Sequence, residues 1–140
     1  MTFPRRVVFD TNIWISGLIW RGDPYRCLKL AYAGLVRPLY CTLMLAELTQ
    51  KLRSSFSFSE NHIEAVAYDY KRLGDLIKIN GDLRVVKDDH DDDKFIECAL
   101  TGNASVVVSG DNHLVNLGAY GKVHIMTANR FLLEMQTSTG

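Results

Sequence analysis

Short apolar runs alternate with stretches of helical periodicity along almost the whole chain. Strands are expected at five of these runs, residues 6–9, 36–40, 83–86, 105–109 and 123–126. Helical patterning separates each pair, which is typical of parallel β-α-β units with helices on both faces of a sheet. Continuous apolar runs such as Val106 to Val108 suit strands covered on both faces. The sequence therefore predicts an α/β protein, a three-layer α/β/α sandwich with a central five-stranded, mostly parallel sheet.

The segments between these runs carry helix signals. Thr42 and either Ser59 or Asn61 are candidate N-caps, and Gly34 and Gly102 are natural helix stops. We expect helices at residues 25–33, 43–52, 94–100 and 128–135, and a short helical turn at 112–117. A longer helical stretch is expected to begin at Ser59 or Asn61 and to end near Gly81. No repeat, low-complexity tract or linker interrupts this pattern, so residues 1–140 are predicted to form one domain.

Composition places the chain among ordinary globular proteins, with 47% hydrophobic and 23% charged residues and a formal net charge of zero. No apolar stretch approaches the ~20 residues of a membrane span, and the N-terminus lacks a signal-peptide pattern, so cytoplasmic residence is the default expectation. The three cysteines are too scattered for a disulfide framework or a zinc cluster, and burial as free thiols is expected.

Acidic residues follow several of the predicted strands. Asp10 comes directly after the run 7–9, and Asp111 follows the run 105–109 by two residues. Asp93 closes the acidic run 88–93, and Glu47 lies in the helix after the second strand. Ligands of open α/β sheets bind outside the carboxyl ends of the strands, and carboxylates gathered there repel one another unless they are protonated or share cations. This pattern predicts a metal site formed by Asp10, Glu47, Asp93 and Asp111.

Each of these acids also has an ordinary structural interpretation. Asp10 and Asp111 are both placed to cap the helix that follows them. Glu47 stands four residues before Lys51, a spacing that suits an exposed ion pair. Asp93 is placed to stabilise a helix N-terminus, but it shares a helix face with Glu97, an unfavourable like-charge spacing that a cation would relieve.

Taken in order, these elements resemble the PIN-domain nucleases, and in particular the small prokaryotic VapC-like toxins of toxin–antitoxin pairs. The matching segments are Val8-Phe9-Asp10-Thr11-Asn12, Glu47 in its helix, Asp92-Asp93-Lys94-Phe95-Ile96-Glu97-Cys98-Ala99-Leu100, Val107-Val108-Ser109-Gly110-Asp111, and Met126-Thr127-Ala128-Asn129-Arg130-Phe131-Leu132. The resemblance covers nearly the whole chain.

What this resemblance implies is a Mg²⁺- or Mn²⁺-dependent endoribonuclease, a homodimer held in check by an antitoxin protein. The family's catalytic and metal-binding acids map to Asp10, Glu47, Asp93 and Asp111, with Asn12 and Ser109 as supporting residues. Thr11 is a further supporting candidate because it is placed to orient Asp10, and Glu97 is another because it shares a helix face with Asp93. Many relatives carry another acid two residues after the last one, where this chain has His113.

An acidic site needs cations outside it to hold RNA. The candidates are Arg21, Lys51, Arg53, Lys71, Arg72 and His113. Trp14 and Trp20 are candidates for stacking on single-stranded bases, although packing in the core is the more common use of such residues.

Other functions remain open from the sequence. One is a PIN-like module that binds RNA or protein without catalysis. Another is a phosphohydrolase with Asp10 as a covalent nucleophile, although such sites usually have a second aspartate where Asn12 stands. A phosphoacceptor receiver domain also gathers acids at strand ends, but it normally has a lysine after its last strand, and residues 126–128 contain none.

Overall fold

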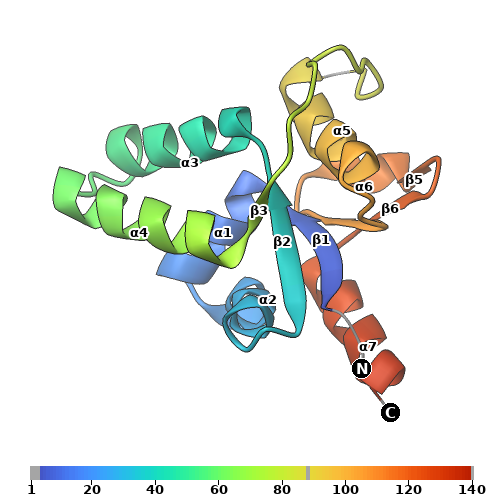
Figure 1. Ribbon diagram of the computed structural model, residues 1–140, viewed down its shortest axis with the longest axis horizontal. Helices are drawn as coiled ribbons and strands as arrows, with labels where there is room; N and C mark the ends of the chain where they lie inside the picture. Colours follow the sequence, from blue (N-terminus) through green and yellow to red (C-terminus); the bar gives the residue numbers. More distant parts are fainter. Residues whose placement is uncertain (1–3, 88, 140) are drawn as a thin grey trace.

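The computed structural model describes residues 4–87 and 89–139. Its sheet is built from β1 (Arg5–Phe9), β2 (Val36–Tyr40), β3 (Asp75–Leu76), β4 (Val106–Val108), β5 (Ala119–Tyr120) and β6 (Val123–Met126). The strand order is β3-β2-β1-β4-β6-β5, and every neighbouring pair is parallel except β5 with β6. The predicted α/β sandwich with a mostly parallel sheet is confirmed, with six strands in place of five (Figure 1).

Strand β1 lies at the centre of the sheet, and the chain order reverses there. Arg5 pairs with Val36 of β2 on one side, and Val8 pairs with Val107 of β4 on the other. Such a reversal point leaves a crevice beyond the carboxyl ends of the two strands. Whatever follows β1 and β4 is therefore placed at the position where open α/β sheets bind ligands.

Seven α-helices and a short 3₁₀ turn complete the described part of the chain: α1 (Thr11–Ile19), α2 (Gly22–Tyr32), α3 (Thr42–Ser54), α4 (Glu60–Leu73), η1 (His90–Asp92), α5 (Asp93–Thr101), α6 (Asn112–Leu117) and α7 (Ala128–Thr139). Helix α5 lies against β1, β2, β4 and β6, while α1, α2 and α7 pack together as a second group. Helices α3 and α4 lie side by side and reach away from the sheet (Figure 1).

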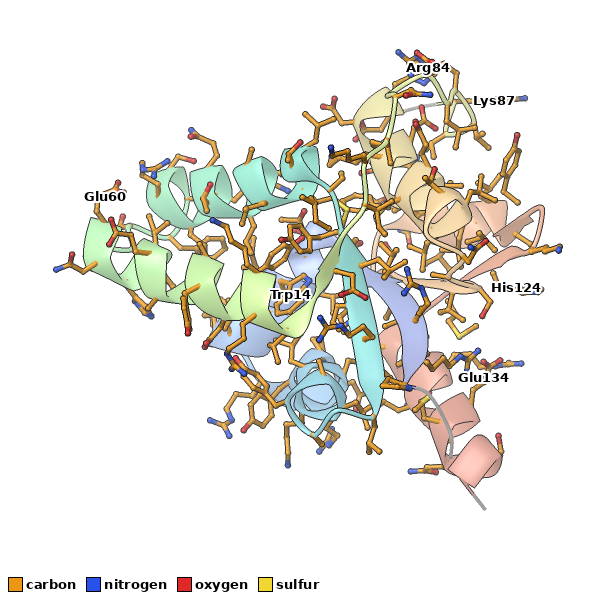
Figure 2. The ribbon with its side chains drawn as sticks, viewed as in Figure 1. Trp14, Glu60, Arg84, Lys87, His124 and Glu134 are labelled. Carbon is orange, nitrogen blue, oxygen red and sulfur yellow. The ribbon has the colours of Figure 1, made fainter. Side chains whose placement is uncertain are left out.

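The core forms where these layers meet. Val7, Val8 and Phe9 of β1 are completely buried, as the continuous apolar run predicts. Trp14, labelled in Figure 2, contacts the rings of Phe9 and Tyr70, at centroid distances of 6.1 and 4.8 Å. Trp14 is thus a core residue, whereas 73% of Trp20 is exposed. All three cysteines are buried free thiols, as expected.

Most of the predicted helix N-caps are confirmed. The side chains of Asp10, Ser59 and Asp111 accept hydrogen bonds from backbone N–H groups in the first turns of α1, α4 and α6. Thr42 is instead the first residue of α3, and Cys41 occupies the N-cap position without a side-chain bond. These caps fix where each helix begins after its strand.

Two predictions for residues 59–86 are wrong. Helix α4 ends at Leu73 rather than near Gly81, because the chain turns at Gly74 and passes directly against β2. A Cβ atom on Gly74 would lie 2.8 Å from the carbonyl oxygen of Pro38. The next strand is therefore β3, Asp75–Leu76, and residues 83–86 form no strand. The short antiparallel β5 was not predicted.

No helix in the described part of the chain is both long enough and apolar enough to span a membrane.

Candidate functional site

Asp10 stands at the carboxyl end of β1 with only 2% of its surface exposed. Its Oδ1 accepts a hydrogen bond from the backbone N–H of Ile13 at 2.9 Å, and its Oδ2 accepts one from the hydroxyl of Ser109. Burial raises the pKa of Asp10 to about 6, and the negative charge of Asp111 adds to this effect. The carboxylate is thus held firmly but is poorly compensated as an anion.

Ser109 joins the ends of β1 and β4. Its buried hydroxyl donates to Asp10 and accepts from the backbone N–H of Asp111 at 2.9 Å. Asp111 in turn caps α6, and its Oδ1 accepts from the N–H of His113 at 2.8 Å. Asp111 therefore has both roles considered from the sequence: it is a helix cap and it lies beside Asp10.

Asp92 is the third acid of this group. It is the N-cap residue of α5, yet its side chain makes no capping bond. Its Oδ2 is buried and has no hydrogen-bond partner in the described part of the protein. Burial raises the pKa of Asp92 to about 7, and the charges of Asp111, Asp89 and Asp10 raise it further, against a smaller opposite effect of Lys94. A buried carboxylate oxygen with no donor is costly unless a cation or proton reaches it.

Glu47 approaches from α3. Its Oε1 accepts from the hydroxyl of Thr11, and its Oε2 lies 2.8 Å from the ammonium of Lys94. Burial alone would raise the pKa of Glu47, but the bonds from Lys94 and Thr11 outweigh it and leave the pKa below its ordinary value. Glu47 thus contacts Lys94 of α5 instead of forming the alternative ion pair with Lys51, although Lys51 is near enough to lower the pKa of both Glu47 and Asp10.

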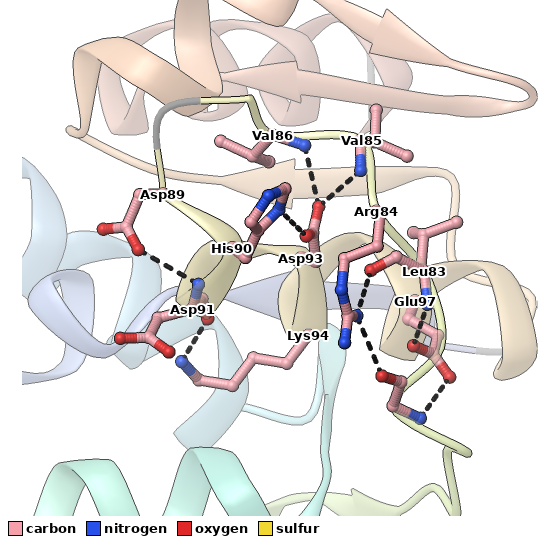
Figure 3. Close-up of polar contacts among 11 residues, drawn as sticks. Leu83, Arg84, Val85, Val86, Asp89, His90, Asp91, Asp93, Lys94 and Glu97 are labelled. Carbon is pink, nitrogen blue, oxygen red and sulfur yellow. Dashed lines mark hydrogen bonds and ion pairs between the residues drawn. The ribbon is translucent and has the colours of Figure 1, made fainter.

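Asp93 has a different environment from its neighbour. Its Oδ1 accepts from the N–H groups of Val85 and Val86 at 2.8 and 2.7 Å, and its Oδ2 lies 3.0 Å from Nδ1 of His90 (Figure 3). Burial opposes ionisation, but these three contacts together hold the pKa of Asp93 below its ordinary value. Both oxygens are therefore engaged in holding the chain segment before α5.

Glu97, one helical turn after Asp93, also binds backbone N–H groups of the segment before α5. Its carboxylate accepts from the N–H groups of Asn80, Gly81 and Leu83 at 3.0, 3.0 and 3.2 Å, and Figure 3 draws the contact with Leu83. Backbone donors, rather than a shared cation, thus compensate the like charges of Asp93 and Glu97. This differs from the interpretation drawn from their spacing alone.

The four acids named from the sequence are not one group. Asp10 and Asp111 lie together, Glu47 is linked to them through Thr11, and Asp93 is turned toward Val85 and Val86. Within residues 4–87 and 89–139, no three His, Cys, Asp or Glu side chains are already placed to hold a metal ion. Asp92 fits such an ion better than Asp93, because its buried Oδ2 lacks a donor and its pKa is raised by the neighbouring acids.

One signal in the sequence separates Asp92 from Asp93. Residues 92, 95, 96 and 99 follow the i, i+3, i+4, i+7 spacing of one helix face, and all four are buried. Extending the apolar face of α5 backward by one turn therefore reaches Asp92. Asp88, the first residue of the acidic run 88–93, lies outside the described residues.

Only some of the supporting residues and candidate RNA contacts lie near the acids. Thr11 and Ser109 are buried at the site, whereas Asn12 is exposed. Arg53 is paired with Glu60 at 2.6 Å, and the guanidinium of Arg21 lies 4.1 Å from the ring centre of Tyr25. The others lie on α3 (Lys51), on α4 (Lys71 and Arg72, the latter 3.4 Å from Asp69) and on α6 (His113). Of this set, Lys51 and His113 lie nearest the acids.

Solved structures share this fold. One is a chain of VapBC2 from Rickettsia felis bound to a DNA fragment from their promoter, with a TM-score of 0.59 and 15% identity, over 86% of this chain and 96% of that one. Another is the RRP44 PIN domain of T. brucei, with a TM-score of 0.53 and 12% identity, over 99% of this chain and 84% of that one. At these identities the likeness concerns the fold alone. No curated protein shows significant sequence similarity to the chain.

The sequence model of the PIN domain matches residues 6–113. That span runs from β1 into α6 and contains Asp10, Glu47, Asp92, Asp93 and Asp111. The match covers well over half of the sequence, in agreement with the sheet order and the acids beyond β1 and β4. The chain belongs to the PIN domain family.

Proposed function

We propose that the protein is a divalent-metal-dependent endoribonuclease that cleaves phosphodiester bonds of single-stranded RNA. The observation that carries the proposal is the charge-coupled group of Asp10, Asp92 and Asp111 beyond β1 and β4, in which a buried oxygen of Asp92 has no donor. Membership of a family of nucleases supports the reaction class. The single-stranded RNA substrate rests on the resemblance of the motifs.

The side chains suit Mg²⁺ or Mn²⁺. Hard divalent cations prefer oxygen ligands, usually one or two carboxylates with several waters retained. We assign Asp10, Asp92 and Asp111 as the residues that hold the ion, with Asp92 in the place first predicted for Asp93. When bound, such an ion lowers the pKa of a coordinated water and neutralises charge on the phosphate oxygens.

The other residues hold this arrangement in place. Ser109 fixes Oδ2 of Asp10 and the backbone of Asp111, so the two acids keep one relative position. Thr11 and Lys94 hold Glu47 ionised beside them, where its carboxylate orients the attacking water. Asp93 and Glu97 fix the connection 80–86 rather than taking part in the chemistry.

The biological role proposed here is that of a toxin in a toxin–antitoxin pair. It rests on the VapC-like resemblance of the motifs and on the fold shared with a chain of VapBC2. An antitoxin protein would then be the partner, and a homodimer the assembly. Helix α4 packs Ile63, Val66, Tyr70 and Leu73 into the core of the protein. Its Tyr68 is 68% exposed and is therefore available for a dimer interface. Sedimentation of the purified chain tests the dimer.

The phosphohydrolase alternative has less support. Such enzymes usually have a second aspartate two residues after the nucleophile, and this chain has the exposed Asn12 at that position. An aspartyl-phosphate trapped during turnover would revive that reaction class.

The experiment is cleavage of labelled single-stranded RNA by the purified chain in Mn²⁺ or Mg²⁺, with EDTA as the control. We expect metal-dependent cleavage that leaves 5′-phosphate and 3′-hydroxyl ends, and its loss in Asp10→Asn with the circular dichroism spectrum retained. Equal cleavage in EDTA would exclude the metal mechanism. Tight RNA binding without Mn²⁺ uptake or cleavage would favour a non-catalytic binding module.

A further inference from the structure

A pocket adjoins the acidic site formed by Asp10, Asp92 and Asp111. It encloses about 360 Å³ between the start of α3, the connection before η1 and the first turns of α5. Glu47 and Lys94 line it, and both also belong to the acidic site, Glu47 through Thr11 and Lys94 through its effect on Asp92. This volume is within the range of small-ligand sites. A strand bound at the acids would therefore continue into it.

The wall of this pocket is an irregular segment held in one shape. Residues 80–86 belong to no helix or strand, yet five of their backbone N–H groups are bound by carboxylates of α5. Glu97 binds three of these groups and Asp93 binds the other two. Figure 3 draws the contacts of Asp93 with Val85 and Val86. A loop anchored at so many points loses little entropy on binding a ligand.

This anchored segment presents Arg84. One nitrogen, Nη1, donates to the carbonyl oxygens of Gly81 and Leu83 at 2.9 and 2.7 Å. These bonds orient the guanidinium and leave its Nε and Nη2 donors without a partner among the described residues. Arg84 forms no ion pair among the described residues, although it lines a pocket with acidic members. A fixed fork of this kind matches the two oxygens of a phosphate.

The acidic members of the pocket are already bound. Glu47 pairs with Lys94, and the carboxylates of Asp93 and Glu97 are occupied by backbone donors. Asp91 is the remaining acid, and it is exposed to solvent. Leu43, 55% exposed, adds an apolar wall with Ile79 and Leu83. The pocket therefore combines an oriented cation with an uncovered apolar surface.

We propose that this pocket is a nucleotide subsite, in which Arg84 binds an RNA phosphate next to the one cleaved and Leu43 contacts the adjoining base. The proposal rests on the proposed function, because it takes RNA as the substrate of the neighbouring acids. Arg84 would then hold the substrate strand, and the contact of Leu43 with a base would give the enzyme a preference for certain RNA sequences.

The test measures binding without cleavage. A short fluorescein-labelled single-stranded RNA is titrated with the full chain in EDTA, and anisotropy gives the Kd at several salt concentrations. Arg84→Gln should weaken binding about tenfold, as loss of one charge-assisted contact does. It should also reduce the slope of log Kd against log salt by about 0.7, the value for one phosphate contact on a single strand.

Two variants serve as comparisons. Arg130→Gln removes the same charge at an exposed position of α7, away from this pocket. This variant should bind RNA with the affinity of the wild type. Arg84→Lys keeps the cation without the fork, so it should retain the salt slope and lose part of the affinity. A thermal melt of each variant shows that it is folded.

Failure of the subsite and failure of the nuclease proposal give different results. If the wild type cleaves RNA with metal, but Arg84→Gln binds with wild-type affinity and salt slope, the subsite is wrong and the nuclease stands. A wild type that neither binds nor cleaves RNA would overturn both. If Arg84→Gln and Arg130→Gln weaken binding equally, the effect is one of net charge and the subsite is again overturned.

Discussion

The hydroxyl of Ser109 donates a hydrogen bond to the carboxylate of Asp10 and so ties the carboxyl ends of β1 and β4 together. The two residues are far apart in the sequence but lie at the point where the strand order reverses. The same hydroxyl accepts from the N–H of Asp111. One buried side chain therefore sets the spacing of two of the three acids to which the metal is assigned.

Ser109→Ala tests this link. The substitution leaves Oδ2 of Asp10 and the N–H of Asp111 without their partner, so both acids lose their fixed position. We expect Mn²⁺-dependent cleavage to fall about 10- to 100-fold, the usual effect of changing a residue that orients a metal ligand. Ser105→Ala, an exposed site next to β4, is the matched control. Wild-type rates in both variants would contradict the positioning role.

Lys94→Met tests how Glu47 is held. The change removes the ammonium 2.8 Å from Oε2 of Glu47 but keeps most of the side-chain volume. We expect the cleavage rate to fall about 10- to 100-fold, and Lys94→Arg to recover part of it. Lys29→Met, on the exposed face of α2, should leave the rate unchanged. An unchanged rate in Lys94→Met would show that this ion pair is dispensable.

Glu97→Ala tests the anchored connection. Three backbone N–H groups, those of Asn80, Gly81 and Leu83, lose their acceptor. We expect faster amide hydrogen exchange at these positions and a loss of about 1–3 kcal/mol in the free energy of unfolding. Glu64→Ala, an exposed glutamate of α4, is the control. Unchanged exchange at residues 80–83 would mean that Glu97 does not hold the segment.

The pH dependence of stability follows from the two raised pKa values. Asp10, with a pKa of about 6, and Asp92, with a pKa of about 7, bind protons more tightly when folded than at their ordinary value of 3.8. Their contribution to stability is full at low pH and is lost as pH rises through these values. The free energy of unfolding of the metal-free protein should therefore fall between about pH 5 and pH 8.

Denaturant unfolding in EDTA measures this effect, and Asp92→Asn should flatten the dependence. Glu47 and Asp93 have lowered pKa values, so their opposite contributions are lost only at lower pH, below this window. Added Mn²⁺ should stabilise the wild type more at pH 8 than at pH 5, because it binds the ionised carboxylates. Stability that rises with pH in EDTA would contradict the charge coupling of the acids.

Much of the fold follows from local signals. Short, mainly apolar runs predict β1, β2, β4 and β6, and short polar residues predict the caps at Asp10, Ser59 and Asp111. The segment 83–86 was misassigned because its apolar residues imitate a strand, whereas its N–H groups are bound by carboxylates of α5. Such contacts depend on tertiary structure, which periodicity does not describe.

Three of the four acids named from the sequence belong to the proposed site. Asp10, Glu47 and Asp111 follow from their places relative to strands and helices, and the structure brings them near one another. Asp92 and Asp93 are adjacent acids at a helix start, where boundaries are least certain and one position turns a side chain by about 100°. The face shared with residues 95, 96 and 99 favours Asp92, but that face depends on where the helix begins, so the partners of each carboxylate decide between the two acids.

The central claim is tested most directly by Mn²⁺ binding to Asp92→Asn and Asp93→Asn, measured by electron paramagnetic resonance at neutral pH. The two variants lose the same charge at neighbouring positions, and the side-chain amide oxygen in Asp93→Asn can still accept from the N–H groups of Val85 and Val86. We predict near-wild-type Mn²⁺ affinity in Asp93→Asn and a loss exceeding about 100-fold in Asp92→Asn, more than is usual for an indirect contact. Wild-type affinity in Asp92→Asn together with lost binding in Asp93→Asn would contradict the account.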